Sequence, residues 1–177
     1  MKLLLFSLFP FLCQASWQVG AGTGAYLGAA QLQGQYQAEE SPHSYQLSFG
    51  FTRDQIVKEI RQYSFIYQYS WTKKNYDRHS WDPIRTGVFA TYTDNSHYYF
   101  TSPEKYNNDV YYDVNSVRWG LRLSTQITAT ELIEKPIIFS LDGSLLEKGI
   151  ISYINNYKEL DVFKYFWSLG FSVRVEF

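Results

Sequence analysis

Residue types that serve acyl transfer and hydrolysis stand together in one polar segment. Asp94, Ser96 and His97 fall within four consecutive positions. A hydrolase or acyltransferase uses a serine nucleophile, a histidine base and a carboxylate that orients the histidine. Nearness in the chain is not triad geometry, Asp and Ser are ordinary turn residues, and the Gly-x-Ser-x-Gly nucleophile motif is absent. The segment is therefore a candidate catalytic site, with a plain polar loop as the alternative.

Metal and cofactor chemistry find little support in the residue types. The chain has one cysteine, Cys13, and three histidines, no two of which stand at a metal-ligand spacing. The oxygen-rich stretch 104–113 lacks the Asp-x-Asp-x-Asp-Gly order of a calcium loop. With 16 basic and 17 acidic side chains the formal charge is 16 − 17 = −1, which disfavours nucleic acid as a partner. We expect no metal, no cofactor and no nucleic acid.

Charged side chains recur at the polar positions of segments in which polar and apolar residues alternate. The members of this group are Arg85, Arg118, Arg122, Asp142, Arg174 and Glu176. If such segments enclose a lumen, these charges point into it, and buried charges must be paired. We expect a network that joins the arginines to Asp142, Glu176 and nearby Gln and Ser side chains. The functional alternative is a narrow anion site near Arg118 and Arg122.

β-Strands are the elements that would position these groups, because period-two alternation extends over most of the chain. The clearest case is 163–177, where every odd position is apolar and only Phe166 interrupts the polar or small residues between them. Eight strands are predicted, at 17–25, 30–36, 45–52, 60–71, 84–93, 117–129, 137–145 and 163–177. Asp142 and Gly143 could form a hairpin turn inside one of them, and residues 149–155 could extend that strand or add another, so ten strands are the alternative.

Alternation fits both a soluble barrel with an apolar inside and a membrane barrel with a polar inside. Three features favour the membrane barrel. The polar faces carry Gln, Ser, Gly and Thr rather than Lys and Glu, Tyr and Trp crowd the strand ends, and the last alternating strand finishes on Phe177. Tyr and Trp rings prefer the headgroup level of a bilayer. The soluble alternative, a periplasmic ligand-binding β-barrel, predicts an apolar lumen instead.

The C-terminal strand also carries a family pattern. Residues 168–175 read Ser-Leu-Gly-Phe-Ser-Val-Arg-Val, in the order polar-x-Gly-x-x-apolar-x-apolar, and Glu176 and Phe177 follow. This ending resembles the C-terminal sorting signal of bacterial outer-membrane β-barrel proteins. The matching positions are Gly170, Phe171, Val173, Val175 and Phe177. The resemblance covers this one strand, and it implies folding by the barrel-insertion machinery of a Gram-negative outer membrane.

The N-terminus, residues 1–15, has the pattern of a secretory signal peptide. Lys2 precedes an apolar run over 3–13, which is shorter than the ~20 residues of a membrane-spanning helix. Cys13 and Ala15 then supply small residues at the −3 and −1 positions of a cleavage site. The alternative is an uncleaved anchor. Cleavage after Ala15 would leave one domain, 16–177, of 177 − 15 = 162 residues without a cysteine.

Chain length agrees with a closed barrel. Eight membrane strands of roughly 9–11 residues, with their turns, use most of such a domain, and the sheet must close because lipid offers no partner to an open edge. An even strand count places both termini on the periplasmic side and the long loop 94–116 outside. The predicted fold is all-β: a closed antiparallel transmembrane β-barrel of eight strands, with a lumen filled by side chains and no general pore.

These expectations lead to export into the outer membrane of a Gram-negative bacterium, with a structural or surface-interaction role. Outer-membrane lipid and lipopolysaccharide would be its surroundings. Six aromatic side chains within 94–116 predict either packing on the extended strands above the bilayer or a contact surface for an extracellular ligand or another cell. Two alternatives stay open: a lipid A-modifying acyl hydrolase or transferase that uses His97, and the soluble periplasmic barrel.

Overall fold

The computed structural model describes residues 15–24, 28–38, 41–52, 60–94, 115–130, 134–147, 150 and 167–177. Within these residues one antiparallel sheet contains β1 (Ala15–Gly24), β2 (Gly28–Ala38), β3 (His43–Thr52), β4 (Ile60–Ser70), β5 (Lys74–Asn75), β6 (His79–Asp94), β7 (Asn115–Ala129), β8 (Ile137–Leu146) and β9 (Trp167–Glu176). No helix in the described part of the chain is both long and apolar enough to cross a membrane.

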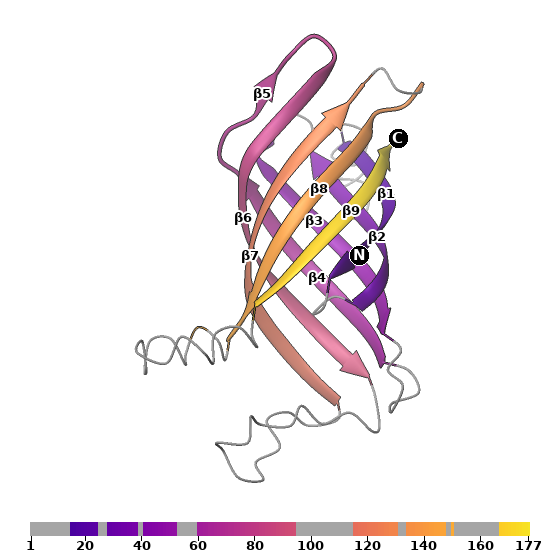
Figure 1. Ribbon diagram of the computed structural model, residues 1–177, viewed down its shortest axis with the longest axis vertical. Helices are drawn as coiled ribbons and strands as arrows, with labels where there is room; N and C mark the ends of the chain where they lie inside the picture. The colour runs from indigo at the N-terminus through magenta and orange to yellow at the C-terminus, as the bar shows by residue number, and fades with distance from the viewer. Residues whose placement is uncertain are drawn as a thin grey trace, which may run out of the picture.

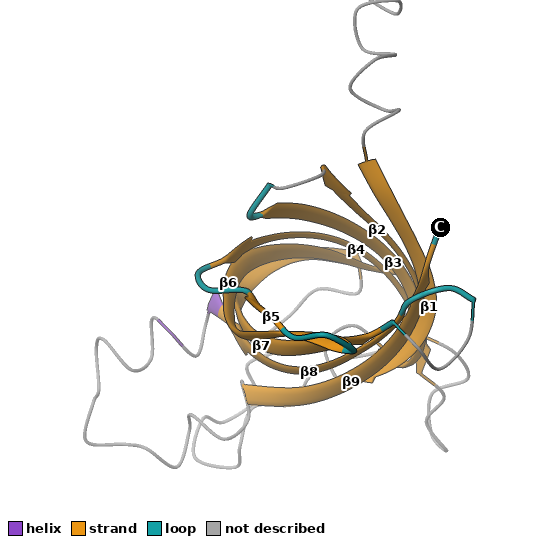
Figure 2. Ribbon diagram, turned by 90° about the horizontal axis from the view of Figure 1, so that it is seen from above, coloured by secondary structure: helices purple, strands orange, loops and turns teal. Residues whose placement is uncertain are grey.

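The sheet closes on itself. Its order is β4-β3-β2-β1-β9-β8-β7-β6-β5, and β4 also pairs with β6. Eight strands of the described chain therefore form a continuous ring, which Figure 2 shows from above. The two-residue β5 pairs with β6 and is not a member of this ring. The prediction of an all-β, closed, antiparallel eight-stranded barrel is confirmed. All eight predicted strands are present, with ends that differ by a few residues.

Strand pairing gives the tilt of the barrel. Each residue of the ring has a paired residue on the next strand. When these pairs are traced once around the ring from Arg118 on β7, they return to β7 at Thr128, which is 128 − 118 = 10 residues further along the chain. An eight-stranded barrel with such an offset has strands inclined by about 40° to its axis. The inclination is visible in Figure 1. It brings residues far apart in sequence to one level of the lumen.

Burial alternates along every strand of the ring, and the polar side is the buried one. The lumen-facing residues are mostly Gln, Ser, Thr and Arg, whereas the outward residues are mostly Leu, Val, Ile, Phe, Tyr and Trp with large exposed fractions. Leu47, for example, is 66% exposed, and Gln46 beside it is 1% exposed. A small apolar cluster of Ile66, Phe89 and Leu146 shares the lumen. This burial is the reverse of that in a soluble barrel.

The ten-strand alternative is wrong, because eight strands close the ring. Of its segment 149–155, only residue 150 is among the described residues. β8 runs straight through Asp142 and Gly143, which pair with Ser124 and Leu123 on β7. On the other side the same two residues pair with β9. A turn at this position would break both ladders, so the strand pairing overrides the local turn signal of Asp-Gly.

The connection between the predicted strands 60–71 and 84–93 needs a correction. β6 already begins at His79, and β5 pairs with its first residues, so that a hairpin projects beyond the rim of the barrel (Figure 1). The strand start was missed because the register slips here: β6 advances three residues from Asp82 to Arg85 while β7 advances two. Such a β-bulge shifts the side-chain alternation by one position, which hides the strand from a period-two pattern.

Candidate functional site

The predicted catalytic segment can be placed only at its first residue. Asp94 is the exposed last residue of β6, in register with Arg61 on β4 and Asn115 on β7. Ser96 and His97, and loop 94–116 from 95 to 114, lie outside the described residues, as does the predicted signal peptide except for Ala15. The structure brings no catalytic group to Asp94 among the residues it describes. Among the described residues, the candidate site is therefore the group of buried polar and charged side chains in the lumen.

Arg122 and Asp142 form a two-point ion pair inside the barrel. Arg122 Nη2 lies 2.8 Å from Asp142 Oδ2, and Arg122 Nε donates to Asp142 Oδ1 at 3.2 Å. Their strands are neighbours, and both side chains are almost fully buried. A guanidinium and a carboxylate that meet along two parallel bonds fix each other's orientation. This pair joins two of the residues predicted for the lumen network.

Arg85 is held by a carboxylate and by neutral oxygens. Its Nε lies 3.4 Å from Asp82 Oδ2. Its two terminal nitrogens donate to the Gln126 side-chain oxygen and to the Ser44 hydroxyl. Asp82 is not among the predicted lumen residues, because a β-bulge between Asp82 and Arg85 breaks the alternation and turns Asp82 inward. The one feature of the sequence that could have identified Asp82 is its position three residues before Arg85, which was predicted to point inward.

Arg174 is bound by amide and hydroxyl oxygens. Its Nη1 donates to the Gln35 side-chain oxygen and, at 3.4 Å, to that of Gln46. Its Nη2 donates to Gln126 Oε1 at 2.9 Å and to Ser140 Oγ at 3.4 Å. Arg174 is 1% exposed. Since Gln126 also accepts from Arg85, one neutral oxygen serves two positively charged groups.

A glycine gives the Arg174 side chain its path across the lumen. Gly20 on β1 is the register partner of Arg174. A Cβ at Gly20 would lie 2.7 Å from Arg174 Cγ and 2.0 Å from the carbonyl oxygen of Val173. Because no side chain occupies this place, Arg174 can pass over β1 and reach Gln35 on β2.

The remaining two predicted network residues lie apart from these clusters. Arg118 is buried on β7, in register with Thr91, and belongs to the end of the barrel where β6 finishes. Glu176 is only half-buried near the other end, and its backbone N–H donates to Pro136 O at 3.0 Å. No group of three or more His, Cys, Asp or Glu side chains within the described ranges is placed to hold a metal ion.

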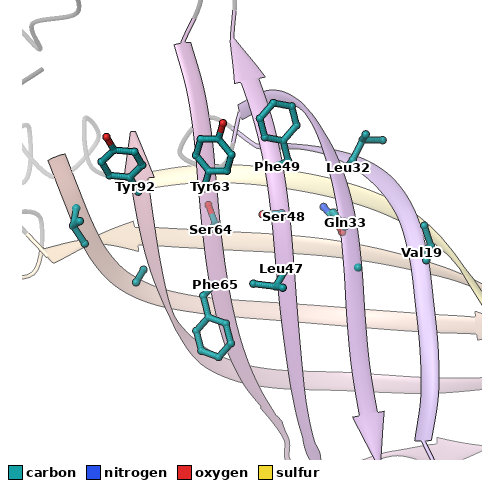
Figure 3. Close-up of a pocket in the computed structure, with 13 residues that line it drawn as sticks. Val19, Leu32, Gln33, Leu47, Ser48, Phe49, Tyr63, Ser64, Phe65 and Tyr92 are labelled. Atoms are coloured by element: carbon teal, nitrogen blue, oxygen red, sulfur yellow. The ribbon is translucent and has the colours of Figure 1, made fainter. Parts of the chain in front are cut away.

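Aromatic side chains form two outward-facing groups near the two ends of the barrel. One group runs from ring to ring over β1 to β4, with centroid distances of 5.1 to 6.5 Å: Trp17, Tyr36, Tyr45, Tyr67, His43, Tyr69 and Trp71. The other group is Phe49, Tyr63 and Tyr92, with centroids 5.2 and 6.3 Å apart. Figure 3 shows these three in one row, with both tyrosine hydroxyls pointing away from Phe65.

A hollow of about 670 Å³ lies on the outer wall beside the second aromatic group. Leu32, Leu47 and Phe65 line it together with that group (Figure 3). Gly34, also in its lining, would meet nothing within 4 Å if it carried a Cβ. The hollow is a gap in the apolar surface and contains no charged side chain among its lining residues.

The residues of the predicted sorting signal lie on β9, at the seam with β1. Phe171, Val173 and Val175 face outward or are half-exposed, and Gly170 pairs with Gly24. Phe177 is 63% exposed, and its N–H donates to Trp17 O at 2.8 Å. The Lys135 ammonium lies 3.7 Å from the centroid of the Phe177 ring.

No protein-family model and no curated protein sequence matches this chain. One solved structure with similarity to it is that of a major outer membrane protein from Thermus thermophilus. The two chains are 14% identical, the alignment covers 92% of this chain and 99% of that one, and the TM-score is 0.44.

Proposed function

We propose that this protein spans the outer membrane of a Gram-negative bacterium as an eight-stranded β-barrel with a structural or surface-interaction role. The single observation that carries the proposal is the reversed burial: Arg, Gln and Ser are inside, and Leu, Val and Phe are outside. In water such a surface would be unstable, because contiguous apolar patches of this extent mark membrane or partner contact. In lipid it is the expected arrangement.

The aromatic groups support the same orientation. Tyr and Trp are enriched where the hydrocarbon of a bilayer meets the headgroups. Here one group sits near the start of β3 and the end of β4, and the other near the opposite ends of those strands. The apolar residues between them, such as Leu47 and Phe65, would lie in the hydrocarbon. The protein would contact outer-membrane lipid and lipopolysaccharide directly.

The lumen supports a non-catalytic role. Among the described residues, arginine, aspartate, glutamine and serine side chains of the lumen are bonded to one another. Since side chains just fill the interior of an eight-stranded barrel, we expect no general pore. The surface-interaction part of the proposal rests on loop 94–116, whose aromatic residues would bind an extracellular ligand. The test of that part is binding of whole cells that make the intact chain compared with cells that make a chain with this loop shortened.

Electrophoresis tests the barrel in its membrane. The membrane fraction is loaded unheated and boiled in SDS. A closed membrane barrel resists SDS until it is heated, so we expect two mobilities for the one chain. A single mobility, with the protein in the soluble fraction, would contradict the proposal.

A charge placed on the outer wall tests which medium that wall meets. Leu47→Arg would lower the free energy of unfolding by about 2–4 kcal/mol if the residue lies in the bilayer, but by less than about 0.5 kcal/mol if it lies in water. Tyr76→Arg is the matched control, because Tyr76 is an exposed aromatic residue on the hairpin beyond the rim. Equal effects of the two substitutions in lipid vesicles would overturn the membrane orientation.

The C-terminal strand offers a test of the insertion partner. Removal of Phe177 would slow or abolish assembly in cells, because a residue of such a sorting signal would contact the barrel-insertion machinery. The same chain refolded in detergent would still close, since β1 and β9 keep their seven paired positions from Gln18 to Gly24. Normal assembly in cells without Phe177 would count against the sorting signal.

A further inference from the structure

Two glycines of the described strands lie on the outer wall of the barrel, Gly34 on β2 and Gly143 on β8. Each stands between two buried polar residues, so its own place is on the outward face. At Gly143 a Cβ would lie 3.0 Å from the Trp167 ring, which covers the position. At Gly34 a Cβ would meet nothing within 4 Å. The side chains of the protein therefore fill one gap in the wall and leave the other open.

The gap at Gly34 belongs to the hollow of about 670 Å³ on the outer wall. Gly34 pairs with Val19 on β1 and with Leu47 on β3. A second small residue, Ala90, pairs with Phe65 and also lines the hollow. Two small residues thus flank Leu47 and Phe65, which are themselves paired, and they deepen one stretch of an otherwise bulky apolar wall.

Aromatic rings give this hollow walls that restrain one another. Tyr63 lies 5.2 Å from Phe49 and 6.3 Å from Tyr92, measured between ring centroids. Phe65 is stacked on Tyr45 with centroids 6.4 Å apart. Aromatic pairs at such distances attract each other. The hollow is therefore preformed, and a preformed site binds a ligand with less loss of side-chain freedom.

The hollow has hydroxyl groups at one end and an apolar lining elsewhere. In Figure 3 the hydroxyls of Tyr63 and Tyr92 point away from Phe65, toward the end of the barrel where β4 begins and β6 finishes. Three other polar residues border the hollow, but their side chains are buried on the lumen side: Gln33, Ser48 and Ser64. This distribution matches a ligand with a polar head and a hydrocarbon chain.

The position of the hollow between the two aromatic groups gives it a depth in the bilayer. Tyr63 and Tyr92 belong to one group, and Tyr36 belongs to the other. Gly34 lies two residues from Tyr36 on the same face of β2. Because tyrosine rings prefer the headgroup level, Gly34 lies at the depth of the hydrocarbon, and the hollow leads there from the headgroups beside Tyr63.

We propose that this hollow binds one acyl chain of a lipid of the surrounding bilayer, with the lipid headgroup beside Tyr63 and Tyr92. The inference rests on the proposed function, because it requires an outer wall that faces lipid. Within a bilayer no hydrophobic effect holds a chain against the protein, so packing decides where the chain stays. A chain in the hollow contacts protein below it and on both sides, whereas a chain elsewhere on the convex wall contacts protein on one side and gains less dispersion energy.

Native mass spectrometry tests the lipid site. The full chain is refolded into vesicles of dimyristoylphosphatidylcholine and extracted in a mild non-ionic detergent, and we expect a barrel that retains one phospholipid. Gly34→Phe fills the hollow from a position with free space. It would lower the fraction of barrels that carry the lipid by about tenfold, which corresponds to about 1.4 kcal/mol. Leu141→Phe is the matched control, because Leu141 is an exposed residue of β8 outside the hollow, and it would retain the lipid.

A phosphatidylcholine that carries a diazirine in the middle of its acyl chain locates the lipid. After illumination we expect adducts on β3 and β4 around Leu47 and Phe65, and their loss in Gly34→Phe. Equal labelling of the outer wall on β3, β4 and β8 would overturn the inference. If Gly34→Phe does not fold, Ala90→Leu fills the same hollow from β6, where Ala90 is exposed.

Three results of the mass measurement would contradict the lipid site. One is a wild-type barrel that inserts into the vesicles and shifts its mobility on heating but retains no lipid. Another is equal retention by the wild type and Gly34→Phe. The third is a mass of two chains that becomes one chain in Gly34→Phe, which would assign the hollow to a second copy of the protein. A chain that does not insert into vesicles at all would instead contradict the proposed function, so the two failures are told apart.

Discussion

Arg122 and Arg174 are both buried in the lumen, but their guanidinium groups meet different surroundings. Arg122 has a carboxylate on the neighbouring strand and forms two bonds with it. Arg174 reaches across the lumen to three glutamines and a serine. In the first arrangement a bonded carboxylate compensates the charge of Arg122. In the second, neutral side chains accept hydrogen bonds from Arg174, and none of these bonded partners carries a negative charge.

The difference shows what each part of the lumen tolerates. In the Arg122 cluster, removal of either Arg122 or Asp142 leaves the other as an unpaired buried charge, so the fold is destabilised by the loss of either one. In the Arg174 cluster the partners are neutral, and removal of the arginine leaves amides that can turn to other donors or to water. The two clusters should therefore respond very differently to substitutions of the same size.

Asp142→Ala should have the largest effect. It leaves Arg122 buried without its carboxylate, and breaking a buried pair from one side costs about 3–5 kcal/mol. Urea unfolding of the barrel in detergent measures this loss. The double variant Asp142→Ala with Arg122→Met would recover most of it, because no unpaired charge remains. A double variant as unstable as the single one would show that the pair contributes packing rather than charge compensation.

Gly20→Ala should come next, and it acts on the β1–β9 seam beside the Arg174 cluster. The added Cβ would lie 2.0 Å from Val173 O and 2.6 Å from Arg174 Cα, so the β1–β9 seam must move. Overpacking of this kind costs about 1–3 kcal/mol. Gly34→Ala is the matched control, since it meets nothing within 4 Å and should stay within about 0.5 kcal/mol. Equal stabilities would mean that the β1–β9 seam can move to admit the Cβ at no cost.

The sequence predicted the barrel well because its main signal is local. Each strand has one polar and one apolar face, so alternation alone placed every strand of the ring and put Arg122, Asp142 and Arg174 on the inner face. The signal failed where the period slips. The bulge between Asp82 and Arg85 hid the first residues of β6 and the projecting hairpin.

The partners of each arginine could not be predicted in the same way. Arg122 and Asp142 sit on adjacent strands, 20 positions apart, and were named together among the inward charges. Arg174 and Gln35 are 139 positions apart and meet only because the strands are inclined and offset by 10 residues around the ring. That offset is a property of the closed sheet and cannot be predicted from the sequence of a single strand.

Arg174→Met should have the smallest effect on stability, and it compares the two clusters most directly. Because the partners left behind are neutral, we expect a loss of about 0.5–1.5 kcal/mol. Arg122→Met removes the same side chain but leaves Asp142 as a buried, unpaired carboxylate, so about 3–5 kcal/mol should be lost. Both variants are unfolded in urea under the same detergent and salt conditions. If they lose equal stability, the carboxylate does not distinguish the two regions, and the charge of Arg174 must be compensated within the fold as fully as that of Arg122.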